Sequence, residues 1–204
     1  MPTPAGAYYA VSSSKPDAGR RLVMSLMAGI ESPQLDLQVL EKKLEGQAGT
    51  DVAELLYNLQ KLGYVQAVAK PYAPPGKSLE EVLSPILVQL SSVGKALLAD
   101  AQGFYIATAG FAHESAEEIS ALSADLAVLH ARHTGLIEKN LGLSSSSWGL
   151  IDASGNSQLG LWPLYIGEYR FVLALAGMPL LNQPQFTDLV WLLFRRYGGV
   201  VSGV

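Results

Sequence analysis

The order of hydrophobic patterns from Ser78 onward limits the folds that this chain can adopt. A helical pattern is followed by two strand-like runs, a long helical pattern, three strand-like runs and a last helix. Because only Ala101-Gln102-Gly103 joins the first two runs, they predict a hairpin. The segment therefore predicts an α/β (α+β) domain of order α-β-β-α-β-β-β-α with a five-stranded, mainly antiparallel sheet. The expected strands cover residues 95–100, 104–109, 148–152, a run through Leu159 and Leu161, and residues 170–176.

A proline-rich segment divides the chain before this domain. Pro71–Lys77 (PYAPPGK) contains three prolines and one glycine, which is typical of a linker. The charge balance changes at the same place. Residues 1–77 hold eight basic and seven acidic groups, whereas residues 78–204 hold six basic and eleven acidic groups. We therefore expect a linker over residues 71–77 and a separate domain over residues 78–204.

The N-terminal part predicts a smaller, helical module. Residues 1–16 are small and polar and contain proline, so we expect a flexible tail there. Three helical patterns follow, and the run Tyr64–Val68 alternates like a short strand. Three short helices followed by a strand predict a winged-helix-like helical module over residues 17–70.

Composition excludes several classes of protein. Of the 204 residues, 49% are hydrophobic and 16% are charged, so the chain can bury a sizeable core and is not disordered. The formal net charge of −4 argues against a general nucleic-acid binder. The absence of cysteine excludes cysteine nucleophiles, iron–sulfur clusters, thiolate zinc sites and disulfides.

The sequence also predicts a protein without a membrane segment. The first fifteen residues lack a basic start and an unbroken apolar stretch, so no signal peptide is expected. Residues 171–194 are strongly apolar, but Pro179 and Pro184 interrupt them. We therefore expect a soluble, cytoplasmic protein.

No motif assigns catalysis or nucleotide binding to this chain. The pairs Gly76-Lys77 and Gly94-Lys95 lack the preceding glycine of a phosphate-binding loop. No Gly-x-Ser-x-Gly elbow is present, and Ser144–Ser147 is best interpreted as a polar loop. We assign no catalytic residue and no cofactor.

Two histidines raise the possibility of a metal site. His130 and His133 lie three residues apart on a predicted helix, a spacing that can direct two imidazoles toward one ion. Asp125 or Glu138 would have to supply a third ligand. A packed or capping role for the histidines is favoured, so no metal ligand is assigned.

The predicted long helix, from about Glu114 to Asn140, has apolar residues on two sides. The expected core side carries Ile119, Leu122, Leu126, Leu129, His133 and Leu136. Small apolar residues on the other side would permit close approach of another helix, although alanine is also simply a good helix former. Trp148–Asp152 follows a polar loop and is typical of an edge strand. The candidate homodimer interface therefore comprises Ala121, Ala124, Val128, Ala131, Gly135, Trp148, Leu150 and Asp152.

The run LLADAQGFYIATAG at Leu97–Gly110, together with the order of elements, resembles the Roadblock/LC7 family. The shared pattern is Asp100-x-x-Gly103 in a hairpin, followed by Ile106-Ala107-x-x-Gly110. The resemblance covers residues 78–199. It implies a small dimeric module found with small Ras-like GTPases or dynein, with bacterial relatives that act on a polarity GTPase. No catalytic residue defines the family.

These patterns lead to one functional hypothesis and two alternatives. The sequence predicts a non-catalytic homodimeric scaffold or regulator that binds a small Ras-like GTPase and modulates its nucleotide cycle. A second Roadblock-like protein could replace the self-partner. One alternative is a dimeric DNA-binding transcription regulator, but the third predicted helix offers only Lys61 against Asp51 and Glu54 for phosphate contact. The other alternative is a small-ligand sensor.

Overall fold

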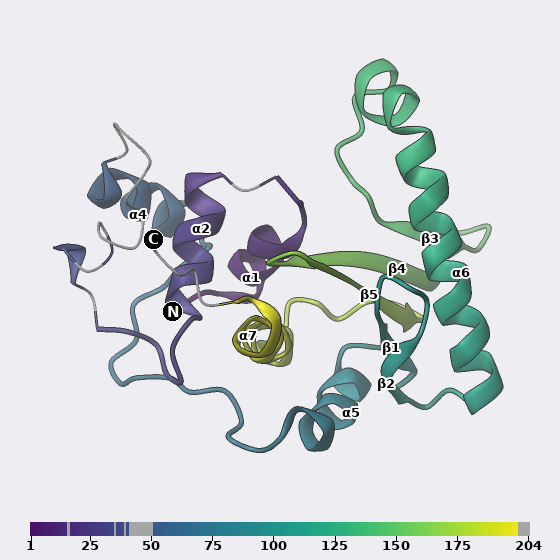
Figure 1. Ribbon diagram of the computed structural model, residues 1–204, viewed down its shortest axis with the longest axis horizontal. Coiled ribbons are helices and arrows are strands. Elements are labelled where there is room, and N and C mark those ends of the chain that lie inside the picture. The colour runs from purple at the N-terminus through teal and green to yellow at the C-terminus, as the bar shows by residue number, and fades with distance from the viewer. Residues whose placement is uncertain (16, 35, 39, 41–50, 200–204) are drawn as a thin grey trace. The chain divides into compact units, whose positions relative to one another are not determined.

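The computed structural model describes residues 1–199 apart from 16, 35, 39 and 41–50 (Figure 1). The chain divides into two compact units. The first contains Met1–Leu79, Tyr165–Glu168 and Leu181–Val204. The second contains Glu80–Leu164 and Tyr169–Leu180. The last helix, which was expected with the C-terminal domain, therefore groups with the N-terminal helices.

A five-stranded sheet of order β2-β1-β5-β4-β3 forms most of the second unit. The β1–β2, β1–β5 and β3–β4 pairs are antiparallel, which confirms the predicted sheet. Its helices also follow the predicted order, although the long helix ends earlier than expected and continues as a π-helical turn, η1. The elements are α5 (Leu79–Gln89), β1 (Ala96–Ala99), β2 (Tyr105–Ala109), α6 (His113–Arg132), η1 (Gly135–Asn140), β3 (Trp148–Ile151), β4 (Ser157–Ile166) and β5 (Tyr169–Ala176).

Helix α6 packs on the sheet through small residues. Ala116, Ser120 and Ser123 are its buried residues. The hydroxyl of Ser120 donates to the Ala116 carbonyl at 2.7 Å, and that of Ser123 donates to the Ser120 carbonyl at 2.7 Å. Because these hydroxyls are satisfied within the helix, they can be buried without a partner from the sheet. Ala116 belongs to a core cluster that also contains Leu97, Ala99, Leu161, Val172 and Ala174.

This packing corrects the predicted core side of the long helix. Ile119 and Leu126 do pack against the core cluster. Leu122, Leu129 and Leu136, however, are 42%, 38% and 50% exposed. The buried side of the helix contains Ser120 and Ser123. These three leucines therefore lie on a flank of the helix and not on its core side.

The β1–β2 turn also packs closely on α6. One carboxylate oxygen of Asp100 accepts hydrogen bonds from the backbone N–H groups of Gln102 and Phe104, at 2.9 and 3.0 Å. This turn requires a positive φ of 90° at Gly103. A Cβ on Gly103 would lie 3.2 Å from Ala121 Cα and 3.3 Å from Ala124 Cβ. The turn therefore depends on glycine for both its conformation and its packing.

The first unit contains the helices α1 (Pro4–Val11), α2 (Ala18–Leu26), α4 (Val52–Lys61) and α7 (Pro184–Tyr197). Helix α1 lies where a flexible tail was expected. The side chain of Thr3 caps it by accepting from the Gly6 N–H at 3.1 Å, and Pro4 occupies its first turn. Ala7 and Val11 are fully buried. Small residues therefore made a buried helix resemble a tail in the sequence.

The strand predicted at Tyr64–Val68 is a single bridge. Val65 pairs with Pro2, next to hydrogen bonds that join Gln66 to Met1 and Thr3 to Tyr64. No second strand accompanies it to form a wing within the described part of residues 17–70. Leu37 and Leu40 are helical as expected, but the end of that predicted helix lies outside the described residues.

Helix α7 is anchored to the other segments of the first unit. It packs against α1, where the Tyr8 and Phe186 rings lie 6.2 Å apart. The indole N–H of Trp191 donates to the Gly29 carbonyl at 2.9 Å. From the predicted linker, the Tyr72 hydroxyl donates to a carboxylate oxygen of Asp188 at 2.6 Å. The segment 71–77 is thus held at Tyr72.

Gly103→Ala is expected to destabilise the chain by about 1–3 kcal/mol, because it adds both φ strain and a close contact with α6. Gly155→Ala is the matched control: Gly155 has a φ of 84°, but a Cβ added to it would meet no other atom within 4 Å. The control should lose about 1 kcal/mol from strain alone. Urea unfolding of both variants measures the difference, and equal losses would contradict the close packing.

The buried carboxyl of Asp188 should make stability depend on pH. Asp188 is 8% exposed, and burial raises its pKa above the usual value. A raised folded-state pKa contributes stability at low pH that is lost as the pH rises through it. Asp188→Asn stays neutral and keeps an oxygen for Tyr72. Relative to the native chain, this variant should therefore gain stability between about pH 4 and pH 7.

Urea unfolding at several pH values within that window checks this expectation. Glu168→Gln, at an exposed carboxylate of the same unit, is the control for the removal of one carboxylate. A pH-independent difference for Asp188→Asn would show that Asp188 binds its proton equally in both states.

Candidate protein–protein interface

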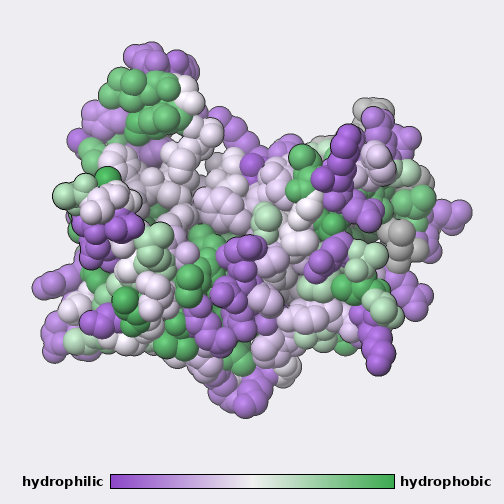
Figure 2. All heavy atoms as spheres, turned by 180° about the vertical axis from the view of Figure 1, so that it is seen from behind, coloured by the Kyte–Doolittle hydropathy of each residue, from purple (hydrophilic) through white to green (hydrophobic). Residues whose placement is uncertain are grey.

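Exposed apolar side chains are concentrated between residues 122 and 151 of the second unit. We call this region the α6–β3 surface. Figure 2 shows apolar side chains gathered at the projecting end, where α6 runs into η1 and the loop that follows. Large exposed apolar groups of this kind mark contact surfaces when they are contiguous. The members are Leu122, Val128, Leu129, Leu136, Leu141, Leu143, Trp148, Leu150 and Ile151.

Strand β3 lies at the edge of the sheet, as predicted. It pairs with β4 on one side only, where Trp148 faces Leu161 and Leu150 faces Leu159. Leu150 and Ile151 are 63% and 70% exposed, and the strand carries no charge. An uncharged apolar edge strand is a template for pairing with another chain, and proteins usually cover or block such an edge.

A histidine–tryptophan contact fixes β3 to α6. The indole N–H of Trp148 donates to Nδ1 of His130 at 3.3 Å, and the rings meet edge to face with centroids 6.2 Å apart. His130 is therefore a packing residue that accepts a hydrogen bond. His133 ends the helix, where its backbone N–H bonds carbonyls of the last turn. Among the described residues, no three side chains of the metal-binding types are grouped to hold an ion.

The structure divides the predicted small-residue face of α6 into two parts. Ala121 and Ala124 lie beside the β1–β2 turn at Gly103, so the chain itself makes part of the predicted close approach. Val128, Ala131 and Gly135 are exposed. The outward positions of Leu122 and Leu129 were missed, because their spacing matched that of a core stripe.

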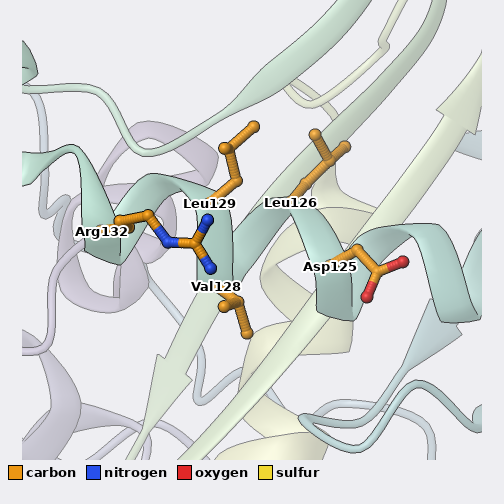
Figure 3. A pocket seen from close by; sticks show the side chains of 5 residues that line it. All are labelled: Asp125, Leu126, Val128, Leu129 and Arg132. Atoms are coloured by element: carbon orange, nitrogen blue, oxygen red, sulfur yellow. The ribbon is translucent and has the colours of Figure 1, made fainter.

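The outer side of α6 carries a shallow, open hollow between charged residues. Figure 3 shows the five side chains that line it, with Asp125 and Arg132 toward opposite ends and the apolar groups between them. All five belong to one stretch of α6. Such a hollow suits contact with another side chain better than enclosure of a small molecule. The lining residues are Asp125, Leu126, Val128, Leu129 and Arg132.

Asp152, the last predicted interface residue, is engaged in its own turn. Its carboxylate accepts from the backbone N–H groups of Asn156 and Ser154, at 2.9 and 2.8 Å. The Asn156 backbone bond, followed by those of Ser154 and the side chains of Asn156 and Gln158, lowers the pKa of Asp152. Asp152 therefore ends β3 and shapes the turn to β4, while Trp148 and Leu150 lie on the strand itself.

A tyrosine–histidine–glutamate contact lies at the start of α6. The Tyr105 hydroxyl is 2.8 Å from Nδ1 of His113, and Nε2 of His113 is 3.4 Å from a carboxylate oxygen of Glu117. Such a row can move a proton when it is enclosed with a substrate. Here both the His113 and Glu117 side chains are more than 60% exposed. The contact links β2 to α6.

Comparison with known proteins finds similarity to solved structures. No family model and no curated protein matches the chain. A Roadblock/LC7 domain from Streptomyces avermitilis matches with 18% identity and a TM-score of 0.41, covering 59% of this chain and 98% of that one. MglB from Myxococcus xanthus matches with 16% identity and a TM-score of 0.39, covering 58% and 93%. Each of these two matches covers about three fifths of this chain.

None of the described helices is both long and apolar enough to cross a bilayer.

Proposed function

We propose that this chain is a non-catalytic, homodimeric scaffold or regulator that binds a small Ras-like GTPase and modulates its nucleotide cycle. The observation that carries the proposal is the α6–β3 surface. Its apolar groups and its unpaired strand edge are features of a surface that another protein covers.

A second copy is the partner that the edge strand fits best. Two-fold pairing of β3 with its own mate would satisfy the free backbone N–H and C=O groups of both edges and continue the sheet across both copies. It would also bring exposed groups of α6, such as Val128 at 58% exposure, near the same axis. One symmetric contact would therefore cover apolar surface on the strand and the helix together.

The GTPase partner is supported by the resemblance in the Leu97–Gly110 run and by the order of elements. The chain contains no phosphate-binding loop, so the nucleotide would be bound and hydrolysed by the partner. Regulation would then act through contacts that reshape the switch segments of the GTPase.

For the first unit we propose a protein-docking role. Helix α4 exposes Tyr57, and Leu62 follows at its end; both side chains are 64% exposed. The helix has Asp51 and Glu54 at its start and Lys61 in its last turn. This arrangement favours contact with a protein over contact with phosphates.

The dimer proposal predicts the mass of the particle in solution. At micromolar concentration, light scattering should give about 43 kDa, twice the chain mass of 21.7 kDa. Val128→Glu should shift the mass toward the monomer, because two carboxylates would be buried near the axis at a cost of roughly 2 kcal/mol or more. Val88→Glu, at an exposed valine on α5, should remain dimeric. A monomeric native chain would exclude the homodimer.

The GTPase proposal is tested with purified components. Small GTPases of the native host are loaded with GDP or with a non-hydrolysable GTP analogue and passed over the immobilised chain. We expect at least one to be retained in a nucleotide-dependent manner, and its rate of GTP hydrolysis or nucleotide release to change when the chain is added. The chain alone should hydrolyse no GTP. Retention of no GTPase in either nucleotide state would refute the proposal.

A further inference from the structure

The outer side of α6 has a charge pattern that is complementary to itself. Asp125 and Arg132 are seven residues apart, so they lie within about 20° of each other around the helix and about 10 Å apart along it. That distance is too long for an ion pair within one helix. Within the part of the chain that the structure describes, neither side chain has an ionic partner.

Two apolar side chains lie between these charges. Val128 and Leu129 are 58% and 38% exposed, and they line the same hollow (Figure 3). The midpoint between Asp125 and Arg132 falls between Val128 and Leu129. The pattern along this side of the helix is therefore an anion, an apolar centre and a cation.

Only one relative direction of two such helices matches these charges. If a second α6 packs parallel and in register, each carboxylate meets a carboxylate and each guanidinium meets a guanidinium. If it packs antiparallel about the midpoint, Asp125 meets the partner's Arg132 at both ends, and Val128 meets the partner's Leu129 at the centre. Like charges across a contact are repulsive, so the antiparallel arrangement is favoured.

We propose that a second copy of this chain occupies the outer side of α6, antiparallel, with the two-fold axis between Val128 and Leu129. Asp125 of each copy pairs with Arg132 of the partner subunit. The inference rests on the proposed homodimer and specifies its register. An antiparallel β3–β3 pairing also requires a two-fold axis, and the His130–Trp148 contact holds the strand on the same helix. One axis can therefore serve both contacts.

Charge reversal tests this register by measuring the dimer dissociation constant. Asp125→Arg and Arg132→Asp should each weaken the homodimer roughly tenfold or more, because two symmetric attractions become repulsions. The double variant should restore the native constant. The two single variants, when mixed, should form a heterodimer in preference to either homodimer. All of these differences should shrink at high salt.

Two variants control for the change of charge itself. Glu168→Arg and Arg21→Asp make the same changes of charge at exposed positions of the first unit. Both should dimerise like the native chain, and far-ultraviolet circular dichroism should show that every variant is folded.

Cross-linking provides a second measurement that does not depend on charge. The chain contains no cysteine, so each introduced cysteine is the sole thiol. Asp125→Cys mixed with Arg132→Cys should form an intersubunit disulfide on mild oxidation, while either variant alone should not, because its two thiols would lie about 10 Å apart along the axis.

The outcomes separate this inference from the proposed function. A native dimer in which the single reversals behave like their controls would overturn the register and leave the homodimer standing. So would a double variant and a mixture that both fail to restore dimers. A monomeric native chain would overturn the homodimer and the register together.

Discussion

The second unit is built around the close packing of α6 on the sheet through small residues. Ala116, Ser120 and Ser123 bring the helix backbone near the strands, and both hydroxyls are satisfied by carbonyls of the helix itself. Large residues on this line would hold the helix away from the sheet. The consequence is that the larger apolar residues, Leu122 and Leu129, lie on the flank and remain exposed.

This arrangement connects the core to the proposed interface. The β1–β2 turn fits against Ala121 and Ala124 because Gly103 has no side chain. The opposite flank of the helix is joined to the edge strand through His130 and Trp148. Helix and edge strand therefore present one surface, and a partner that pairs with the strand also meets the helix. The family resemblance suggested a dimer, but the charges of Asp125 and Arg132 are what would set its direction.

The first unit is held together by segments that are distant in the sequence. Residues 1–3 pair with residues 64–66, α1 packs against α7, and Tyr72 joins the proline-rich segment to Asp188. The buried carboxyl of Asp188 accepts this phenol hydrogen bond, and burial raises its pKa. Because of these contacts, the C-terminal helix α7 belongs to the same unit as the N-terminal residues.

Local sequence patterns were enough to predict the order of elements, the β1–β2 hairpin at Asp100-x-x-Gly103, and the edge position of β3. These features depend on periodicity, on turn chemistry and on the charge pattern around one strand. The buried side of α6 and the helices that accompany α7 became visible only in the folded chain. Periodicity identifies a helix but cannot choose between two apolar flanks, because that choice depends on the side chains of strands far along the chain. Hydrophobicity patterns also do not predict buried serines or a buried N-terminal helix of small residues. These two features depend on packing between segments that are distant in the sequence.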